Sequence, residues 1–273
     1  MVTLLSWNLH GLNLWPDIAA DATVDVALLQ EARCPEEDCP LDITPTRDSP
    51  WFTAGWEHRP RRTAIARASD RVSLRSREMV DIGDRERSGI VVSRPGTLTA
   101  VDVVVGDTVA FTAVSMYAAW ERPPGEDRPI ASDSSAHRLL SDLATLVWGR
   151  SGHRIVAAGD LNILFGYGDY GSPYWRDRYA TVFERARAMG LHFAGPRHPN
   201  GRQAEPWPEE LPIDSMNVPT YHTHAKGPAG ASRQMDFVFV SQDLAERTRV
   251  RALNEPATWG RSDHCQILIE VDV

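Results

Sequence analysis

Short apolar runs that end on a polar side chain are the feature that most constrains how this chain folds. The clearest run, 154–158, reads Arg-Ile-Val-Ala-Ala and leads into Gly159, Asp160, Leu161 and Asn162. A continuous apolar run of this length is typical of a strand that is buried on both faces. A carboxylate at the end of such a strand is poorly solvated, and it persists when it is paired, protonated or bound to a metal ion.

Two interpretations of the Asp-Leu-Asn segment are open when it is considered alone. Asp160 and Asn162 lie two residues apart, so in an extended segment their side chains point in the same direction. That arrangement would allow both side chains to bind the same ligand. An Asx turn that closes the strand explains the same residues without any chemistry.

The same pattern recurs at other predicted strand ends, which favours chemistry over turns alone. Strands are predicted over 3–7, 25–31, 109–117, 234–241 and 265–271. The polar residues that end, begin or directly flank these strands are Asn8, Glu31, Tyr117, Asp236, Asp263 and His264.

The remaining elements predict an α/β fold. Further strands are expected over 51–56, 63–68, 88–93 and 98–105, with Gly106-Asp107 as a hairpin turn. Helices are expected from Asp133 or Ser134 through Val147, with Gly149 as the stop, and from Ser172-Pro173 to about Met189. Residues 195–219 form a long segment without periodicity, and such segments are functional lids or disordered. No linker or repeat divides the chain, so we expect one domain over 1–273.

Composition excludes some classes of protein. No apolar run approaches the roughly 20 residues that span a bilayer, and no basic region precedes the first strand as in a signal peptide. The formal net charge of −8 argues against strong non-specific binding of polyanions. A bridge between Cys34 and Cys39 is possible, but reduced thiols in a cytoplasmic protein are the preferred interpretation. No membrane contact and no obligate protein partner is evident.

The types of polar residue indicate metal-assisted hydrolysis. Carboxylate and amide oxygens without cysteine ligands suit a hard cation such as Mg²⁺ or Mn²⁺. Histidine beside acids suits proton transfer or the stabilisation of a negatively charged transition state. Because no serine or cysteine nucleophile motif is present, this combination points to attack of water on a phosphoester.

Several short segments together resemble the endonuclease/exonuclease/phosphatase superfamily, which has the DNase I-like fold. They occur in the order of that family and extend over nearly the whole chain. The segments are Ser-Trp-Asn-Leu-His-Gly (6–11), Leu-Leu-Gln-Glu (28–31), Met-Tyr (116–117), Gly-Asp-Leu-Asn (159–162), Met-Asp-Phe-Val-Phe-Val-Ser (235–241) and Ser-Asp-His (262–264). The resemblance implies a two-sheet α/β sandwich with helices on its outer faces.

The resemblance also implies a role for each matching residue. Glu31 is expected to be the main metal ligand, with Asn8 and Asp263 completing the shell. Asp160 would orient or deprotonate the attacking water, and Asn162 would hold the phosphate or that water. The remaining expected roles are phosphoryl binding by His264, orientation of His264 by Asp236, and a hydrogen bond from Tyr117 to the phosphate or leaving group.

The substrate is open between two classes at this stage. A nuclease or phosphodiesterase is favoured, with Arg71 and Arg75 on a phosphate-binding edge and Tyr167 and Trp175 stacking on bases. For these residues a solvated sheet face and the packing of a helix start are the simpler alternatives. A phosphatase or phosphodiesterase for a small molecule or lipid headgroup fits the acidic charge. A binding module without catalysis is the third class, and the complete set of catalytic-type residues argues against it.

Overall fold

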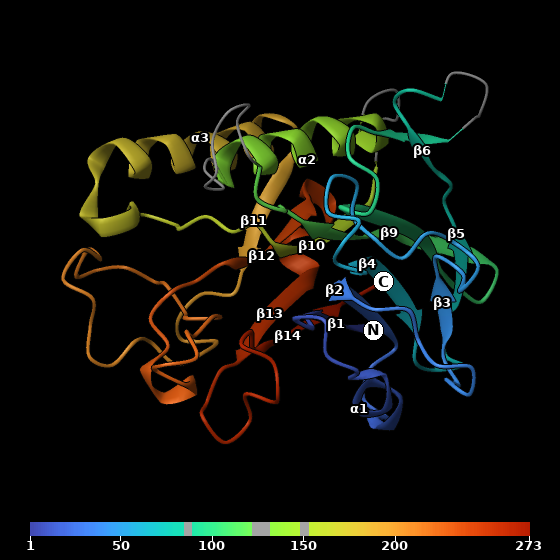
Figure 1. The fold of residues 1–273 in the computed structure, drawn as a ribbon, viewed down its shortest axis with the longest axis horizontal. Coiled ribbons are helices and arrows are strands. Elements are labelled where there is room, and N and C mark those ends of the chain that lie inside the picture. The colour runs from blue at the N-terminus through green and yellow to red at the C-terminus, as the bar shows by residue number, and fades with distance from the viewer. Residues whose placement is uncertain (85–88, 122–131, 148–152) are drawn as a thin grey trace.

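Two six-stranded sheets lie face to face in the computed structural model, which describes residues 1–84, 89–121, 132–147 and 153–273 (Figure 1). The first sheet has the order β13 (Thr248–Leu253), β14 (Gln266–Val271), β1 (Val2–Asn8), β2 (Val26–Ala32), β4 (Arg62–Arg67) and β3 (Asp42–Thr44). The second has the order β11 (Leu191–Gly195), β12 (Asp236–Ser241), β10 (Ile155–Asp160), β9 (Thr108–Tyr117), β8 (Leu98–Val105) and β5 (Ser73–Ser76). A separate pair consists of β6 (Met79–Asp81) and β7 (Ile90–Val92).

Helices cover the outer faces of this sandwich, as expected. The helix α1 (Trp15–Ala20) packs on the first sheet, and α2 (Ser132–Val147) and α3 (Pro173–Ala188) lie together over the second (Figure 1). Short 3-10 helices occur at Asp169–Gly171, Pro228–Gly230 and Gln242–Arg247. None of the helices in the described ranges has the length and apolar character of a membrane span.

Alternation along the central strands places one set of side chains between the sheets. Leu4 on β1 and Val156 on β10 belong to the core between the two sheets, whereas their neighbours Leu5 and Ile155 face the outer helices. Successive side chains in a strand point to opposite faces, so Asn8 and Asp160 share the inner face with Leu4 and Val156. The strand-end polar groups of both sheets therefore meet inside the sandwich.

The parallel pairing of neighbouring strands brings these ends to one edge. β1 runs parallel to β2, with Asn8 opposite Gln30, and β9 runs parallel to β10, with Tyr117 opposite Asp160. Asp236 lies opposite Asp160 at the start of the antiparallel strand β12. The carboxyl ends of four strands and the start of a fifth therefore border one site.

Some local expectations were wrong. Residues 51–56 form turns, because Trp56 N bonds to Thr53 O and Gly55 has a positive φ of 81°. Four short strands were not expected: β3, β6, β11 and β13. Both β11 and β13 are edge strands of their sheets, and β13 carries arginines on its exposed face, which weakens the apolar signal. The helix α2 begins at Ser132, and the expected stop at Gly149 lies outside the described residues.

Candidate active site

Glu31 reaches the interior because the backbone departs from regular strand geometry at that residue. By alternation Glu31 would share the outer face with Leu29, which packs against α1. The pairing of β2 with β4 shifts register between Leu29 and Ala32, and Glu31 has a φ of +48°. A left-handed backbone is costly for a residue with a side chain, and such outliers concentrate at functional sites. The irregularity turns the carboxylate of Glu31 toward Tyr117 and Asn8.

Three polar side chains converge on the Glu31 carboxylate. Tyr117 donates its hydroxyl proton to Glu31 Oε1 over 2.9 Å, and Asn8 Nδ2 lies 3.5 Å from the same oxygen. Arg61 donates from Nη1 to Glu31 Oε2 over 2.6 Å. Burial acts to raise the pKa of Glu31, but the Arg61 and Tyr117 interactions outweigh it and lower the pKa. Glu31 is therefore held as a carboxylate.

Asn8 links this group to Asp160 across the two sheets. It is fully buried at the end of β1, and its Nδ2 donates to Asp160 Oδ2 over 2.9 Å. Its Oδ1 accepts the backbone N–H of His10 over 2.9 Å. Asn8 therefore contacts two of the four carboxylates to which the resemblance gives a role, Glu31 and Asp160.

Asp160 is positioned by a glycine before it and a turn after it. A Cβ on Gly159 would lie 1.9 Å from Met116 O, so only glycine permits this close approach to β9. Asn162, with a φ of +51°, donates its backbone N–H to Asp160 Oδ1 over 2.8 Å. Its Nδ2 lies 3.2 Å from Asp160 Oδ2 and 3.3 Å from Ala118 O. The Asx turn is therefore present, and it also orients the buried carboxylate.

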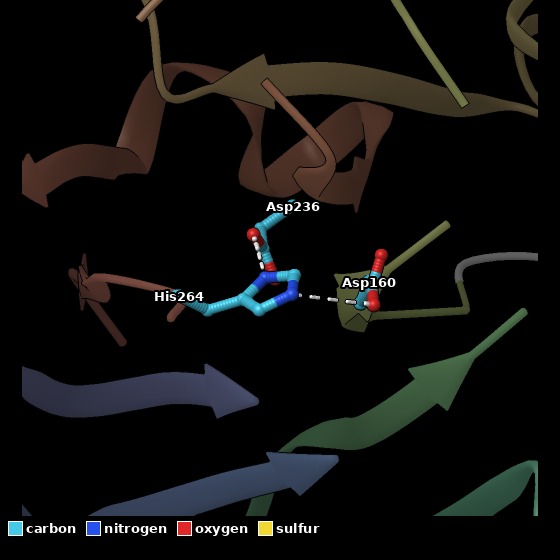
Figure 2. A group of neighbouring side chains, drawn as sticks. All are labelled: Asp160, Asp236 and His264. Carbon is cyan, nitrogen blue, oxygen red and sulfur yellow. Dashed lines mark hydrogen bonds and ion pairs between the residues drawn. The ribbon is translucent and has the colours of Figure 1, made fainter. Parts of the chain in front are cut away.

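His264 lies between two buried aspartates, as Figure 2 shows. Its Nδ1 is 2.8 Å from Asp236 Oδ2, and its Nε2 is 3.8 Å from Asp160 Oδ2. Trp7 Nε1 donates to the carbonyl oxygen of His264, and the ring of Tyr221 lies 5.0 Å from the imidazole ring. These contacts direct one imidazole nitrogen to Asp236 and leave the other facing Asp160.

The two aspartates make His264 a cation. Burial acts to lower its pKa, but the charges of Asp236 and Asp160 and the Asp236 hydrogen bond outweigh burial and raise it. Burial raises the pKa of Asp160, while the His264 charge opposes that shift. Burial and the neighbouring carboxylates Glu31 and Asp160 also raise the pKa of Tyr117 well above its usual range. Tyr117 is therefore a neutral phenol that donates a hydrogen bond.

Asp263 precedes His264 in the chain, and its carboxylate contacts His10 and Ser262 rather than the two other aspartates. Its Oδ2 is 3.3 Å from His10 Nδ1, and its Oδ1 lies 3.4 Å from Ser262 Oγ. Through the backbone N–H of His10 it is connected to Asn8. His10 and Ser262 were missed as site residues although they lie within the motifs, since neither ends a strand.

Oxygen donors in this arrangement fit a hard divalent cation. Glu31 and Asp160 bring carboxylate oxygens from β2 and β10 to the Asn8 amide, which contacts both through Nδ2 and whose Oδ1 accepts the His10 N–H, and no thiol lies among these contacts. Ligand atoms of Asp160, Asp236 and His264 also lie within 4.8 Å of one another. In that second cluster both imidazole nitrogens face carboxylates, so the Glu31 side is the better candidate for a cation.

Comparison with known proteins shows the fold. No family model matches the chain, and no curated protein matches it. Among solved structures, the endonuclease domain of TRAS1, a telomere-specific non-LTR retrotransposon, has a TM-score of 0.60 and 17% identity, covering 100% of this chain and 99% of the other. An AP endonuclease from Archaeoglobus fulgidus gives 0.60 and 16%, with both chains covered completely. The 3' phosphatase NExo from Neisseria, bound to a product DNA hairpin, gives 0.60 and 14%, also with complete coverage.

The chain has the DNase I-like fold. This confirms the expected two-sheet α/β sandwich, with the candidate site at the strand ends where its two sheets meet. Hydrogen bonds connect five of the eight predicted catalytic and metal-binding residues, which are Asn8, Glu31, Tyr117, Asp160 and Asn162. His264 connects Asp236 to Asp160, and Asp263 contacts His10.

The predicted substrate-binding arginines lie elsewhere in this DNase I-like fold. Arg71 donates to Asp25, which precedes β2 and is thus about 20 Å along the strand from Glu31. Arg75 lies on the edge strand β5 opposite Asp102, and Asp102 in turn lies opposite Thr112, five residues before Tyr117. The structure does not bring either arginine to the catalytic groups.

The two predicted aromatics have mainly packing roles. Trp175 stacks on Tyr179 with ring centroids 5.8 Å apart and packs against the core under α3. Tyr167 is buried, and its hydroxyl lies 3.4 Å from Ser232 O. The simpler alternative, packing around the start of a helix, describes Trp175 better than base stacking does.

Arg61 was not singled out from its arginine-rich neighbourhood. Four arginines occur at 59, 61, 62 and 67, and nothing in the local sequence distinguishes one of them from the others. A Cβ on Gly11 would lie 2.2 Å from Arg61 Nε, so the guanidinium lies flat on this glycine while it reaches Glu31. The separation of thirty residues between Arg61 and Glu31 gives no local signal for this pair.

Proposed function

We propose that this protein is a metal-dependent phosphoester hydrolase that cleaves phosphodiesters of the nucleic-acid type by attack of water. One observation carries the proposal: Glu31, Asn8 and Asp160 converge from both sheets beside the Asp236–His264 pair. Oxygen ligands, a buried acid and a cationic imidazole are the groups that such hydrolysis requires. The DNase I-like neighbours, which include two endonucleases, support the same chemistry.

Water is the proposed nucleophile because the neighbouring hydroxyl and thiol groups are engaged. Ser262 Oγ donates to Asn8 O over 2.6 Å, and Ser115 Oγ donates to Leu29 O over 2.7 Å. Cys265 is buried, and burial raises the pKa of its thiol well above the usual range. None of these three side chains combines a free nucleophile with an adjacent base.

Each side chain then has a proposed task. Asp160 orients the attacking water and accepts its proton, because its carboxylate is buried and held by Asn8 and Asn162. His264, kept cationic by Asp236, stabilises negative charge on the phosphoryl oxygen. Tyr117 donates a hydrogen bond toward the phosphate or leaving group.

Glu31, Asn8 and Asp263 are the proposed holders of Mg²⁺ or Mn²⁺. The bound cation would neutralise phosphate charge and polarise the phosphoryl oxygen. Arg61 places its positive charge beside Glu31, so we infer that it orients this carboxylate.

A substrate screen tests this proposal. Purified protein with Mg²⁺ or Mn²⁺, or with excess chelator, is offered plasmid, single-stranded DNA, RNA, a nitrophenyl phosphodiester and a nitrophenyl phosphomonoester. Diesters should be hydrolysed only with metal. Glu31→Gln should reduce the rate by about 100-fold or more, because charge stabilisation in the transition state is lost.

Glu37→Gln is the matched control, since Glu37 is an exposed carboxylate six residues away. It should retain full activity. Undiminished turnover by Glu31→Gln or in chelator would overturn the proposal. Turnover of the monoester alone would replace it by a phosphatase.

A further inference from the structure

A cavity of about 450 Å³ adjoins the candidate active site and has no role in the steps above. Its volume lies within the range typical of small-molecule sites, about 300 to 1,000 Å³. Its lining combines two tryptophans, Trp56 and Trp120, with four basic side chains and one acid, which are His58, Arg59, Arg94, Arg138 and Glu121.

Arg94 joins the two walls of this cavity. From Nε it donates to Ala54 O over 2.8 Å, on the wall that carries Trp56. From Nη1 it donates to Ala119 O over 2.9 Å and to Trp120 O over 3.3 Å, on the opposite wall. One guanidinium therefore ties together the two backbone segments that carry the tryptophans.

The basic side chains of the cavity outnumber its one acid, Glu121. Arg138 is neutralised by Glu121, to which it donates over 2.7 and 3.0 Å. Within the described ranges, neither Arg59 nor Arg94 has a carboxylate within ion-pair distance. Both guanidinium groups lie near the Trp56 ring, at 4.9 and 5.8 Å from its centroid. In a chain with a net charge of −8, this is a local site for an anion beside an aromatic surface.

Two short segments connect the cavity to the catalytic groups. Arg61, which binds Glu31, donates its backbone N–H to Arg59 O over 2.7 Å. On the other wall, Trp120 follows Tyr117 by three residues, so their Cα atoms are at most about 11 Å apart. Between them, Ala118 N donates to Asp160 O. A nucleotide in the cavity would therefore lie near the phosphate that His264 binds and that the water held by Asp160 attacks.

We propose that this cavity binds an unpaired nucleotide adjacent to the scissile phosphodiester, with its base against Trp120 and Trp56 and its phosphate near Arg59. The inference rests on the proposed phosphodiesterase function and names its substrate class as a single strand or an unpaired end. Trp120 is 40% exposed and Arg59 is exposed, so both are accessible to such a ligand.

The requirement for an unpaired base follows from the shape of the ligand. In a duplex the faces of each base are covered by stacking, so an aromatic side chain stacks only on bases that are splayed out or single-stranded. Stacking on tryptophan is tolerant of sequence, because every base has a π face. Both DNA and RNA provide a base next to a phosphodiester. The binding experiment distinguishes between these two ligands.

Binding without turnover tests the inference. Fluorescence anisotropy in chelator measures the affinity for labelled single-stranded DNA, single-stranded RNA and duplex DNA. Trp120→Ala should weaken single-strand binding by about 5- to 100-fold, while Trp120→Phe should retain most of the affinity. Duplex binding should be weaker for the wild type and should change little in Trp120→Ala.

A pair of arginine variants tests the phosphate contact. Arg59→Ala should reduce the magnitude of the log–log salt slope by about 0.7, as expected for one phosphate contact on a single strand. Arg249→Ala makes the same change in net charge on β13, opposite Glu270 and far from Asn8, and should leave the slope unchanged. Melting temperatures of all variants confirm that each is folded.

The outcomes separate this inference from the proposed function. Equal single-strand affinity in the wild type, Trp120→Ala and Arg59→Ala would overturn the cavity assignment and leave hydrolysis standing. Preference of the wild type for duplex would overturn it as well. Trp120-dependent binding in a protein that hydrolyses no phosphoester would support the cavity and refute the enzyme.

Discussion

The two ends of β2 each carry an acid paired with an arginine, fully buried at Asp25 and partly buried at Glu31, yet the two sites differ in what surrounds the acid. Asp25, just before the strand, receives hydrogen bonds from Thr3 N at 2.9 Å, from Arg71 Nε at 2.8 Å and from Ser69 Oγ. Glu31, near the other end, accepts hydrogen bonds from Arg61 and Tyr117. An acid and an arginine at a strand end are therefore common to both ends.

The difference lies in the number of like charges. Asp25 is a single carboxylate whose oxygens are satisfied by donors from the protein. At the other end, Glu31, Asp160 and Asp236 meet with Arg61 and His264; burial raises the pKa of Asp160, and the charges of Asp236 and Glu31 add to that rise. Like charges gathered in one buried place are stabilised by a ligand or a cation, whereas a lone satisfied pair is structural.

The largest expected effect is at the crowded end. His264→Ala should lower kcat by about 100- to 1,000-fold, because the stabilisation of phosphoryl charge is lost. If Asp236 acts only through His264, the double variant should be little slower than His264→Ala, since residues that act as a unit are non-additive. Strictly multiplicative losses would show that the two side chains act separately.

A pH profile of Asp236→Asn sharpens the same test. The Asp236 charge raises the pKa of His264, so its removal should lower that pKa. His264 would then lose its proton at lower pH, and the alkaline limb of the kcat profile should move to lower pH than in the wild type. An unmoved limb would mean that another group controls it.

A smaller effect is expected at the Asp25 end, on stability rather than activity. Asp25→Asn should lower the free energy of unfolding by about 2 to 3 kcal/mol. This is less than for a fully buried pair, because the Arg71 side chain is 57% exposed. Denaturant unfolding measures the change, with the exposed Asp38→Asn as control. A loss of turnover per folded molecule would contradict the structural role.

The smallest effect is expected for Arg71 and Arg75, which the sequence had suggested as phosphate contacts. Their replacement by alanine should leave the salt dependence of oligonucleotide binding unchanged, because neither lies near the catalytic groups. The change in slope should be well below the roughly 0.7 expected for one phosphate contact. A flattened slope in this double variant would restore the original hypothesis and extend the binding surface to β5.

Most of the candidate site could be predicted because its residues are marked by local patterns. Asn8, Tyr117 and Asp160 each end a run of apolar residues, and such a run identifies a buried strand without knowledge of its neighbours. Burial of a polar group at that position is costly, so each of these residues signals a partner. The same reasoning failed for β13 and for 51–56, where the local pattern was weak or misleading.

The sequence by itself determined which polar residues stand at strand ends, since hydrophobic periodicity is a property of neighbouring residues. Only the tertiary structure decided which charges meet: Arg61 with Glu31, Arg71 with Asp25, and His264 between two aspartates. These pairs join residues 28 to 104 positions apart. They depend on strand order, on register and on the irregular backbone at Glu31. Coulombic energy depends on distance in space, so an arginine supports the candidate active site at one end of β2 and forms a structural ion pair at the other.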